Sequence, residues 1–138
     1  MDEISFLFNS WKTCLEIAHD RGYIPDANYL DIQLSDFKHM INDSDTNIDI
    51  VCNNHTSNTN TVLYIKFILG LRIKPSTIKD IYEEILGNLN ESDEMELMIV
   101  LKGKPNNSIL KLQKDKTYVN IQIYWCKQLQ FNVTKHEY

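Results

Sequence analysis

The chain has 138 residues, of which 43% are hydrophobic and 24% charged, and its formal net charge at pH 7 is −5. This size and balance fit one compact globular domain. The acidic net charge argues against a free-standing nucleic-acid binder, and the longest apolar runs are too short for a membrane-spanning helix.

Charge is distributed unevenly along the chain. Residues 1–50 contain three basic and ten acidic residues, and residues 51–96 contain four basic and seven acidic residues. Residues 97–138 reverse this balance, with seven lysines and two acidic residues. An acidic body therefore carries one basic end, which would allow a local phosphate contact in a protein that otherwise repels DNA.

The N-terminal segment is predicted to be helical. Between Glu3 and Arg21, apolar residues recur at steps of three and four and so form one stripe of a helix. Gly22 stands where a left-handed residue would end this helix, and Pro25 disfavours an immediate restart. A second, shorter helix is predicted near Ser35. The stripe of the first helix consists of Ile4, Leu7, Phe8, Trp11, Cys14, Leu15 and Ala18.

The middle of the chain changes from helical to β-type spacing. Ile48–Cys52 and Val62–Ile68 are rich in β-branched and aromatic residues, which predicts two strands. The polar segment Asn53–Asn60 is expected to form the loop between them. Pro75 is expected to open a helix that ends near Gly87.

The C-terminal segment is predicted to combine two more strands with a helix. Leu97–Leu101 is a near-continuous apolar run, typical of a strand covered on both faces. Asn106–Lys114 is expected to be helical, and the alternation in Tyr118–Tyr124 predicts a strand with Val119 among its inward residues. A last apolar patch covers Leu129–Val133. Strands separated by helices predict an α/β fold, with a mixed sheet of about four strands and helices on both faces.

Five short segments, in this order, resemble one family. They are KTCLE at 12–16, HDRGY at 19–23, LSDFK at 34–38, MIVLKG at 98–103 and NVTKHE at 132–137. Each motif is weak alone, but their order and spacing are similar to those of the fifth-largest subunit shared by eukaryotic RNA polymerases I, II and III. The resemblance extends from about Trp11 to Glu137.

This resemblance implies a domain organisation and a role. Family members have an N-terminal jaw domain with a restriction-endonuclease-like fold, which lines the downstream DNA cleft and does no chemistry. Residues 1–134 would be this jaw, and Lys135, His136 and Glu137 would begin the hinge to an assembly domain that this chain does not contain. The implied partners are the largest polymerase subunit, other subunits, downstream duplex DNA and transcription factors. The location would be the nucleus for a cellular protein, and the virion or viral factory for a viral one.

The basic C-terminal segment supplies the candidate DNA contacts. Lysines near phosphate gain from counterion release without reading sequence, which suits a polymerase that moves over any template. At 104–108 the chain has KPNNS where the family has a Thr-Pro-Ser-like turn beside the DNA, so the family's hydroxyl contacts are not expected here. The alternative is that these lysines only solvate the surface. The candidates are Lys102, Lys104, Asn106, Asn107, Lys111, Lys114 and Lys116.

The segment HDRGY at 19–23 has the look of a catalytic motif, but a structural role is expected for it. Gly22 would end the helix and Arg21 would satisfy its last carbonyl groups. Tyr23 would bury its ring and leave its hydroxyl in water.

No metal, cofactor or catalytic residue is predicted. A restriction-like nuclease needs strand carboxylates for Mg²⁺ and a nearby lysine. Asp36-Phe37-Lys38 has the required spacing but lies on a predicted helix, and Asp49 alone is a poor metal site. Two alternatives to a polymerase jaw therefore remain, a stand-alone protein-interaction or scaffold domain and, less favoured, a nuclease. Three separated cysteines without C-x-x-C spacing predict buried, reduced thiols.

Overall fold

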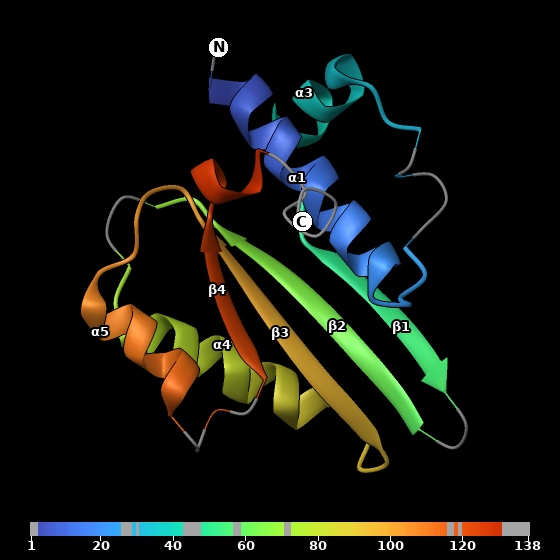
Figure 1. Cartoon of the computed structure of the whole chain (residues 1–138), viewed down its shortest axis with the longest axis vertical. Coiled ribbons are helices and arrows are strands. Elements are labelled where there is room, and N and C mark those ends of the chain that lie inside the picture. The colour runs from blue at the N-terminus through green and yellow to red at the C-terminus, as the bar shows by residue number, and fades with distance from the viewer. Residues whose placement is uncertain are drawn as a thin grey trace, which may run out of the picture.

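The computed structural model describes residues 3–25, 29, 31–42, 48–56, 59–70, 73–115, 118 and 120–130. A four-stranded sheet lies between two helical layers, with α1 and α3 over one face and α4 and α5 over the other (Figure 1). The elements are α1 (Glu3–Asp20), α3 (Leu34–Asn42), β1 (Ile50–Thr56), β2 (Thr59–Ile68), α4 (Pro75–Asn88), β3 (Asp93–Leu101), α5 (Asn107–Leu110), the 3₁₀ helix η1 (Lys111–Lys114), β4 (Ile121–Trp125) and the 3₁₀ helix η2 (Cys126–Leu129).

The sheet is mixed, with strand order β1-β2-β3-β4. β1 and β2 form an antiparallel hairpin, whereas β2–β3 and β3–β4 are parallel pairs. Parallel neighbours need a crossover, and α4 and the α5–η1 segment supply the two crossovers. Ile68 pairs with Leu101, and Leu101 pairs with Trp125, so β2, β3 and β4 end at one edge of the sheet.

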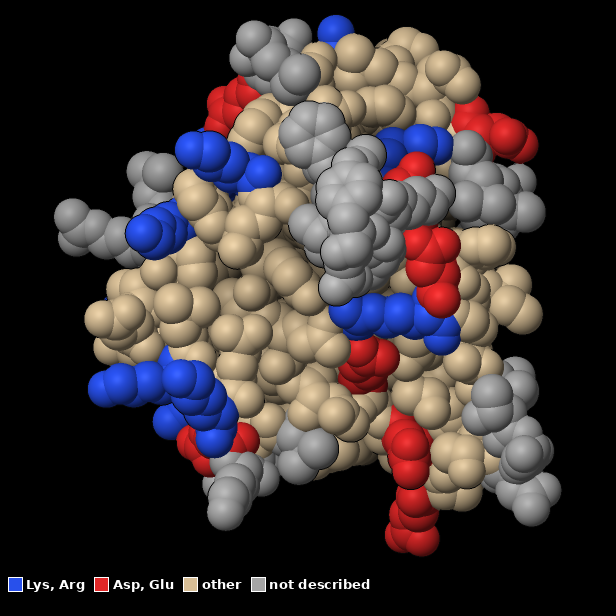
Figure 2. All heavy atoms as spheres, in the orientation of Figure 1, with Lys and Arg blue, Asp and Glu red and all other residues tan. Residues whose placement is uncertain are grey.

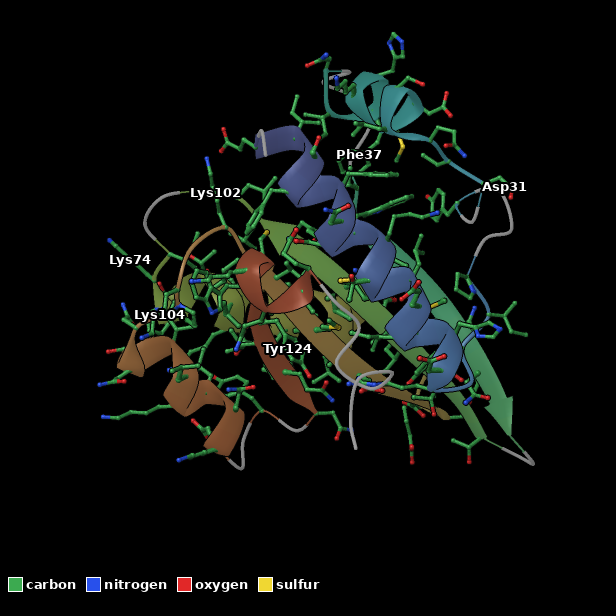
Figure 3. All side chains as sticks on the ribbon, turned by 45° about the horizontal axis from the view of Figure 1, so that its top comes forward. Asp31, Phe37, Lys74, Lys102, Lys104 and Tyr124 are labelled. Carbon is green, nitrogen blue, oxygen red and sulfur yellow. The ribbon has the colours of Figure 1, made fainter. Side chains whose placement is uncertain are left out.

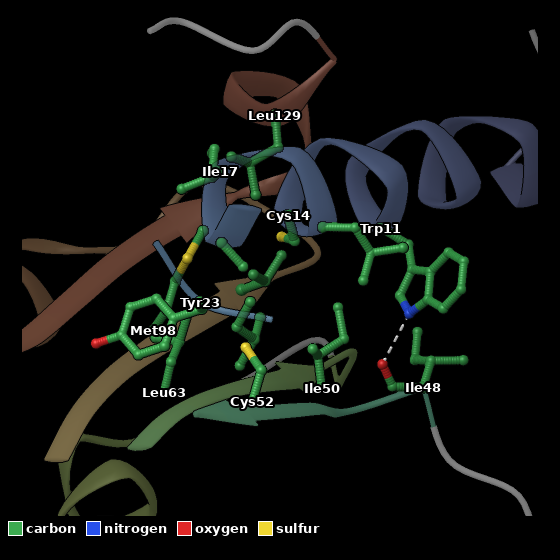
Figure 4. Packing of buried hydrophobic residues seen from close by; sticks show 14 of the residues in the cluster. Trp11, Cys14, Ile17, Tyr23, Ile48, Ile50, Cys52, Leu63, Met98 and Leu129 are labelled. Atoms are coloured by element: carbon green, nitrogen blue, oxygen red, sulfur yellow. Dashed lines mark hydrogen bonds between the residues drawn. The ribbon is translucent and has the colours of Figure 1, made fainter. Parts of the chain in front are cut away.

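The central strand β3 divides the apolar residues between two cores. Met98 and Val100 belong to the cluster under α1, α3 and η2, shown in part in Figure 4. Leu97 and Ile99 belong to the cluster under α4 and α5. All four are fully buried. The predicted α/β fold and the strand covered on both faces are therefore confirmed.

Helix α1 ends through backbone geometry at Gly22. Gly22 has a φ of 89°, and its N–H donates to the His19 carbonyl at 3.0 Å. The Tyr23 N–H donates to the Ala18 carbonyl at 2.9 Å. These two bonds form a Schellman motif, which satisfies carbonyl groups that the helix itself leaves without donors.

The expected polar loop Asn53–Asn60 is wrong, because most of it belongs to the β1–β2 hairpin. Asn53 pairs with Val62, and pairing continues to Thr56 opposite Thr59. Backbone hydrogen bonds along the ladder stabilise these polar positions in extended form, whatever their side chains prefer. The prediction followed side-chain polarity and therefore ended the first strand and began the second at the wrong residues.

The last strand begins at Ile121, three residues later than predicted. Asn120 has a φ of 64°, which takes the chain out of the extended conformation. Its Nδ2 donates to the Met95 carbonyl at 3.2 Å, and its own carbonyl accepts from the Leu97 N–H at 2.9 Å. Asn120 is therefore a turn residue, for which asparagine is suited. Val119 lies outside the described residues, as does Val133 of the last apolar patch.

Candidate nucleic-acid interface

A hollow of about 380 Å³ opens beside the edge where the parallel strands end. Lys74 precedes α4 and Lys104 follows β3, and both side chains are exposed at this hollow. They lie close together in Figure 3 although 30 positions separate them in the sequence. In open α/β sheets, ligands commonly bind outside the carboxyl ends of the strands, which is where this hollow lies. The remaining lining residues are Gly70, Ile73, Leu101, Gly103, Pro105, Asn106 and Ile109.

The sequence prediction missed Lys74, because only the basic C-terminal segment was considered. One signal was available: Lys74 and Lys104 each precede a proline. A residue before proline is held in extended conformation, and Lys74 has φ −95° and ψ 150°. Pro75 occupies the first turn of α4, and Pro105 is buried. The following proline therefore restricts the backbone conformation of both lysines.

The helix α5 separates this hollow from a second one. Asn106 caps α5, since its Oδ1 accepts from the Ile109 N–H at 3.0 Å. Its carboxamide oxygen is therefore engaged within the fold. On the other side of α5 a hollow of about 320 Å³ is lined by Asn107, Leu110, Lys111 and Lys114.

Lys102 lies apart from the other candidate lysines. It pairs with Glu3 at the start of α1. With Glu3 it lines an apolar hollow of about 340 Å³ on the α1 side of the sheet. Lys102 is thus less available to an external anion than the sequence suggested. Lys116 and the hinge candidates Lys135, His136 and Glu137 lie outside the described residues.

Some of the described cations have partners within the fold, whereas others, Lys38 on α3 among them, have no ion pair with the described residues. Arg21 pairs with Glu96, Lys66 with Asp49 and Lys102 with Glu3, while Lys79 and Lys127 lie over aromatic rings. Within the described ranges, no ion pair is found for the four lysines of the two hollows: Lys74, Lys104, Lys111 and Lys114. On the face in Figure 2, basic side chains gather on the side of α5, η2 and the end of β3, others lie near α1 and α3, and most acidic side chains lie away from α5.

The HDRGY segment has a structural role, as predicted, but its partners differ from those expected. The Tyr23 hydroxyl does not face water; it donates to Glu96 Oε2 at 2.7 Å. Arg21 Nη1 donates to Glu96 Oε1 at 2.6 Å, and Gln122 Nε2 donates to the same oxygen at 2.8 Å. Burial and the hydrogen bond to Glu96 raise the pKa of Tyr23. This network fixes the end of α1 against β3 and β4, and sequence spacing could not reveal Glu96.

The residues weighed for a nuclease are dispersed. Asp36 and Lys38 are exposed on α3, where Phe37 is buried between them. Asp49 accepts from the Phe67 N–H at 2.9 Å and pairs with Lys66 at 2.8 Å. Over the part of the chain that the structure describes, no three His, Cys, Asp or Glu side chains are grouped to hold a metal ion, and no helix is long and apolar enough to cross a membrane.

Comparison with protein families gives a match to the family described as RNA polymerase Rpb5, N-terminal domain, over residues 1–85. This match covers more than half of the chain. The chain belongs to the Rpb5 N-terminal domain family. The resemblance seen in the sequence is thereby confirmed over residues 1–85, and membership of this family identifies a DNA-directed RNA polymerase subunit domain that associates with other polymerase subunits. Comparison with curated proteins gives no significant match.

The Rpb5 match divides the candidate interface. Lys74 lies within the matched residues, in the connection between β2 and α4. Lys104, Lys111 and Lys114 lie after them. The fold joins the two parts, because β3 runs parallel to β2 after the crossover through α4 and ends at the edge where β2 ends.

Proposed function

We propose that this Rpb5-family domain is a non-catalytic jaw module, which lines the downstream DNA cleft of its polymerase and contacts the largest subunit. The observation that carries the proposal is the group of four lysines around two hollows, for which the described residues offer no ion pair, on a chain whose net charge is −5. Ammonium groups in this state can neutralise phosphates and release counterions without first breaking an ion pair.

The chemistry of this surface suits a sliding contact. Lysine presents a compact point charge with rotatable donors, so it can contact phosphate without selecting bases. The acidic remainder of the chain limits binding by the isolated domain. In the assembled enzyme, other subunits would hold the duplex nearby and supply a high local concentration.

Three parts of the proposal concern the rest of the polymerase. Residues 1–134 form the jaw, and Lys135, His136 and Glu137 begin the hinge toward an assembly domain. The partners are the largest subunit, downstream duplex and transcription factors, in the nucleus or in a viral compartment. Copurification with the largest subunit tests the first partner. A soluble chain that never recovers this subunit from its native cell would favour the stand-alone scaffold alternative.

The DNA role is tested in assembled polymerase by replacing Lys104, Lys111 and Lys114 with alanine. Retention of the downstream duplex should weaken, and the removal of each phosphate contact should lower the slope of log K against log salt by about 0.9. Sequence preference should not change. Lys38→Ala is the control, because Lys38 is exposed on α3, away from α5 (Figure 1). Slopes equal to wild type would show that these lysines only solvate the surface.

A further inference from the structure

We propose that the hollow between Lys74 and Lys104 seats one backbone phosphate of the duplex, and that Lys111 and Lys114 seat a second one across α5. This inference rests on the proposed DNA role. It adds Lys74 to the interface and divides the contacts into two phosphate-binding sites, which we call seats: one is formed by Lys74 and Lys104, and the other by Lys111 and Lys114.

The first step is the chemistry of the first hollow. Its charged lining residues are Lys74 and Lys104, and no carboxylate is among the described residues that line it. Ile73, Leu101 and Ile109 contribute apolar walls. Two ammonium groups around one hollow repel each other, and an anion between them removes this repulsion. A tetrahedral phosphate, with several acceptor oxygens, can bind both ammonium groups at once.

The second step is positioning. Each lysine precedes a proline that restricts its backbone, and the two segments leave the same edge of the sheet. The pairing of Ile68 with Leu101 fixes the ends of β2 and β3 side by side. Lys74 directly precedes α4 and Lys104 follows the end of β3, and the proline after each lysine restricts its backbone, which lowers the entropic cost of closing on a phosphate.

The third step is the spacing of the second hollow. Asn107, Leu110, Lys111 and Lys114 recur at steps of three and four, so they lie on one side of the α5–η1 segment. Asn106 and Ile109 line the first hollow on the other side. The segment is thus a ridge between two cationic hollows. A regular polyanion such as a duplex backbone has phosphates to fill both, and the exposed Asn107 carboxamide adds a hydrogen-bond donor to the second seat.

If Lys74 and Lys104 bind the same phosphate, the effects of their replacements on the salt dependence of duplex retention should not add. In assembled polymerase, Lys74→Gln and Lys104→Gln should each weaken retention of the downstream duplex. Together they should lower the log–log salt slope by about 0.9, the change expected for one phosphate rather than two. Adding Lys111→Gln and Lys114→Gln should lower it by about 0.9 more. Lys38→Gln is the matched control, and the exposure of all these lysines means that folding should be unaffected.

A chemical probe checks the seat directly. A duplex in which single phosphates are replaced by neutral methylphosphonates should reveal one position whose replacement weakens retention by wild-type enzyme but not by the Lys74→Gln, Lys104→Gln enzyme. A change with Lys104→Gln but none with Lys74→Gln would overturn the shared seat and leave the DNA role standing. No change with any lysine variant would overturn the DNA role as well. Loss of a polymerase subunit with unchanged salt slopes would show instead that these lysines bind an acidic protein segment.

Discussion

Arg21 and Glu96 are joined by a 2.6 Å ion pair that connects the end of α1 to the central strand β3. Their side chains are 29% and 18% exposed, so the pair is largely enclosed by the fold. The Tyr23 hydroxyl binds the other carboxylate oxygen. The segment that resembles a catalytic motif is therefore an attachment point between helix and sheet.

Removing the Tyr23 hydroxyl tests this attachment. Tyr23→Phe should lower the free energy of unfolding by about 1.5 kcal/mol, because the hydroxyl is buried and its acceptor is charged. Tyr124→Phe is the control, since its hydroxyl donates to Gln122 over a longer distance of 3.4 Å. Urea unfolding of the two variants gives the comparison. Equal losses would mean that Glu96 does not stabilise Tyr23 specifically.

Trp11 is predicted to be a main support of the core under α1. It is fully buried, contacts Phe8, Tyr29 and Phe37, and donates from Nε1 to the Ile48 carbonyl at 3.0 Å. Trp11→Ala should cost about 3–5 kcal/mol, as expected for a large aromatic truncation in a core. A urea midpoint equal to that of wild type would contradict the packing shown in Figure 4.

Two glycines should respond in opposite directions to alanine. At Gly22, φ is 89° and a Cβ would lie 3.0 Å from Asn54 Nδ2, so Gly22→Ala should destabilise by about 1–2 kcal/mol. At Gly87, inside α4, a Cβ would meet nothing within 4 Å. Gly87→Ala should therefore stabilise by about 0.5–1 kcal/mol. Thermal unfolding of both variants measures the signs, and a stabilising Gly22→Ala would refute the left-handed helix end.

Stability should fall as pH rises above about 9. Burial raises the pKa of Cys52 from 9.0 to about 11, and burial also raises the pKa of Cys14 and Cys126. Below pH 9.0 the Cys52 thiol keeps its proton in both states. Between pH 9.0 and about 11 only the unfolded thiol ionises, so stability is lost by up to about 1.4 kcal/mol per pH unit for this group.

Cys52→Ala should reduce this slope without abolishing it, because the pKa values of the other buried thiols and of Tyr23 are also raised in the folded state. The measurement is urea unfolding under reducing conditions from about pH 8 to about pH 11, which spans the window between the two Cys52 pKa values. An unchanged slope in Cys52→Ala would show that Cys52 ionises equally in the folded and unfolded states.

The isolated domain should bind duplex DNA very weakly near 0.15 M salt. Its net charge is −5, and a few lysines opposed by an acidic body release few counterions. At that ionic strength the screening length is about 8 Å, so the basic surface acts only at close range. Fluorescence anisotropy with a labelled duplex measures this. Micromolar binding by the isolated chain would mean that polymerase context is not needed.

The sequence by itself determined the helices and the centre of the sheet. The stripe along α1, the helix start at Pro75 and the apolar run Leu97–Leu101 are local signals that act within a few residues. It also predicted the left-handed Gly22, because helix ends depend on nearby backbone geometry. Strand ends were less predictable. Asn53–Thr56 is extended because β2 supplies hydrogen bonds to it, and those bonds are formed between strands.

Only the tertiary structure decided which charges act together. Lys102 belongs to the basic segment in sequence but pairs with Glu3, whereas Lys74 lies outside that segment and joins Lys104. The cause is topological: a crossover returns the chain to the edge where the previous strand began, and the next, parallel strand then ends beside the previous one, so residues about thirty positions apart become neighbours. Composition locates a basic segment, but the availability of each lysine depends on which carboxylates the folded sheet and helices bring beside it.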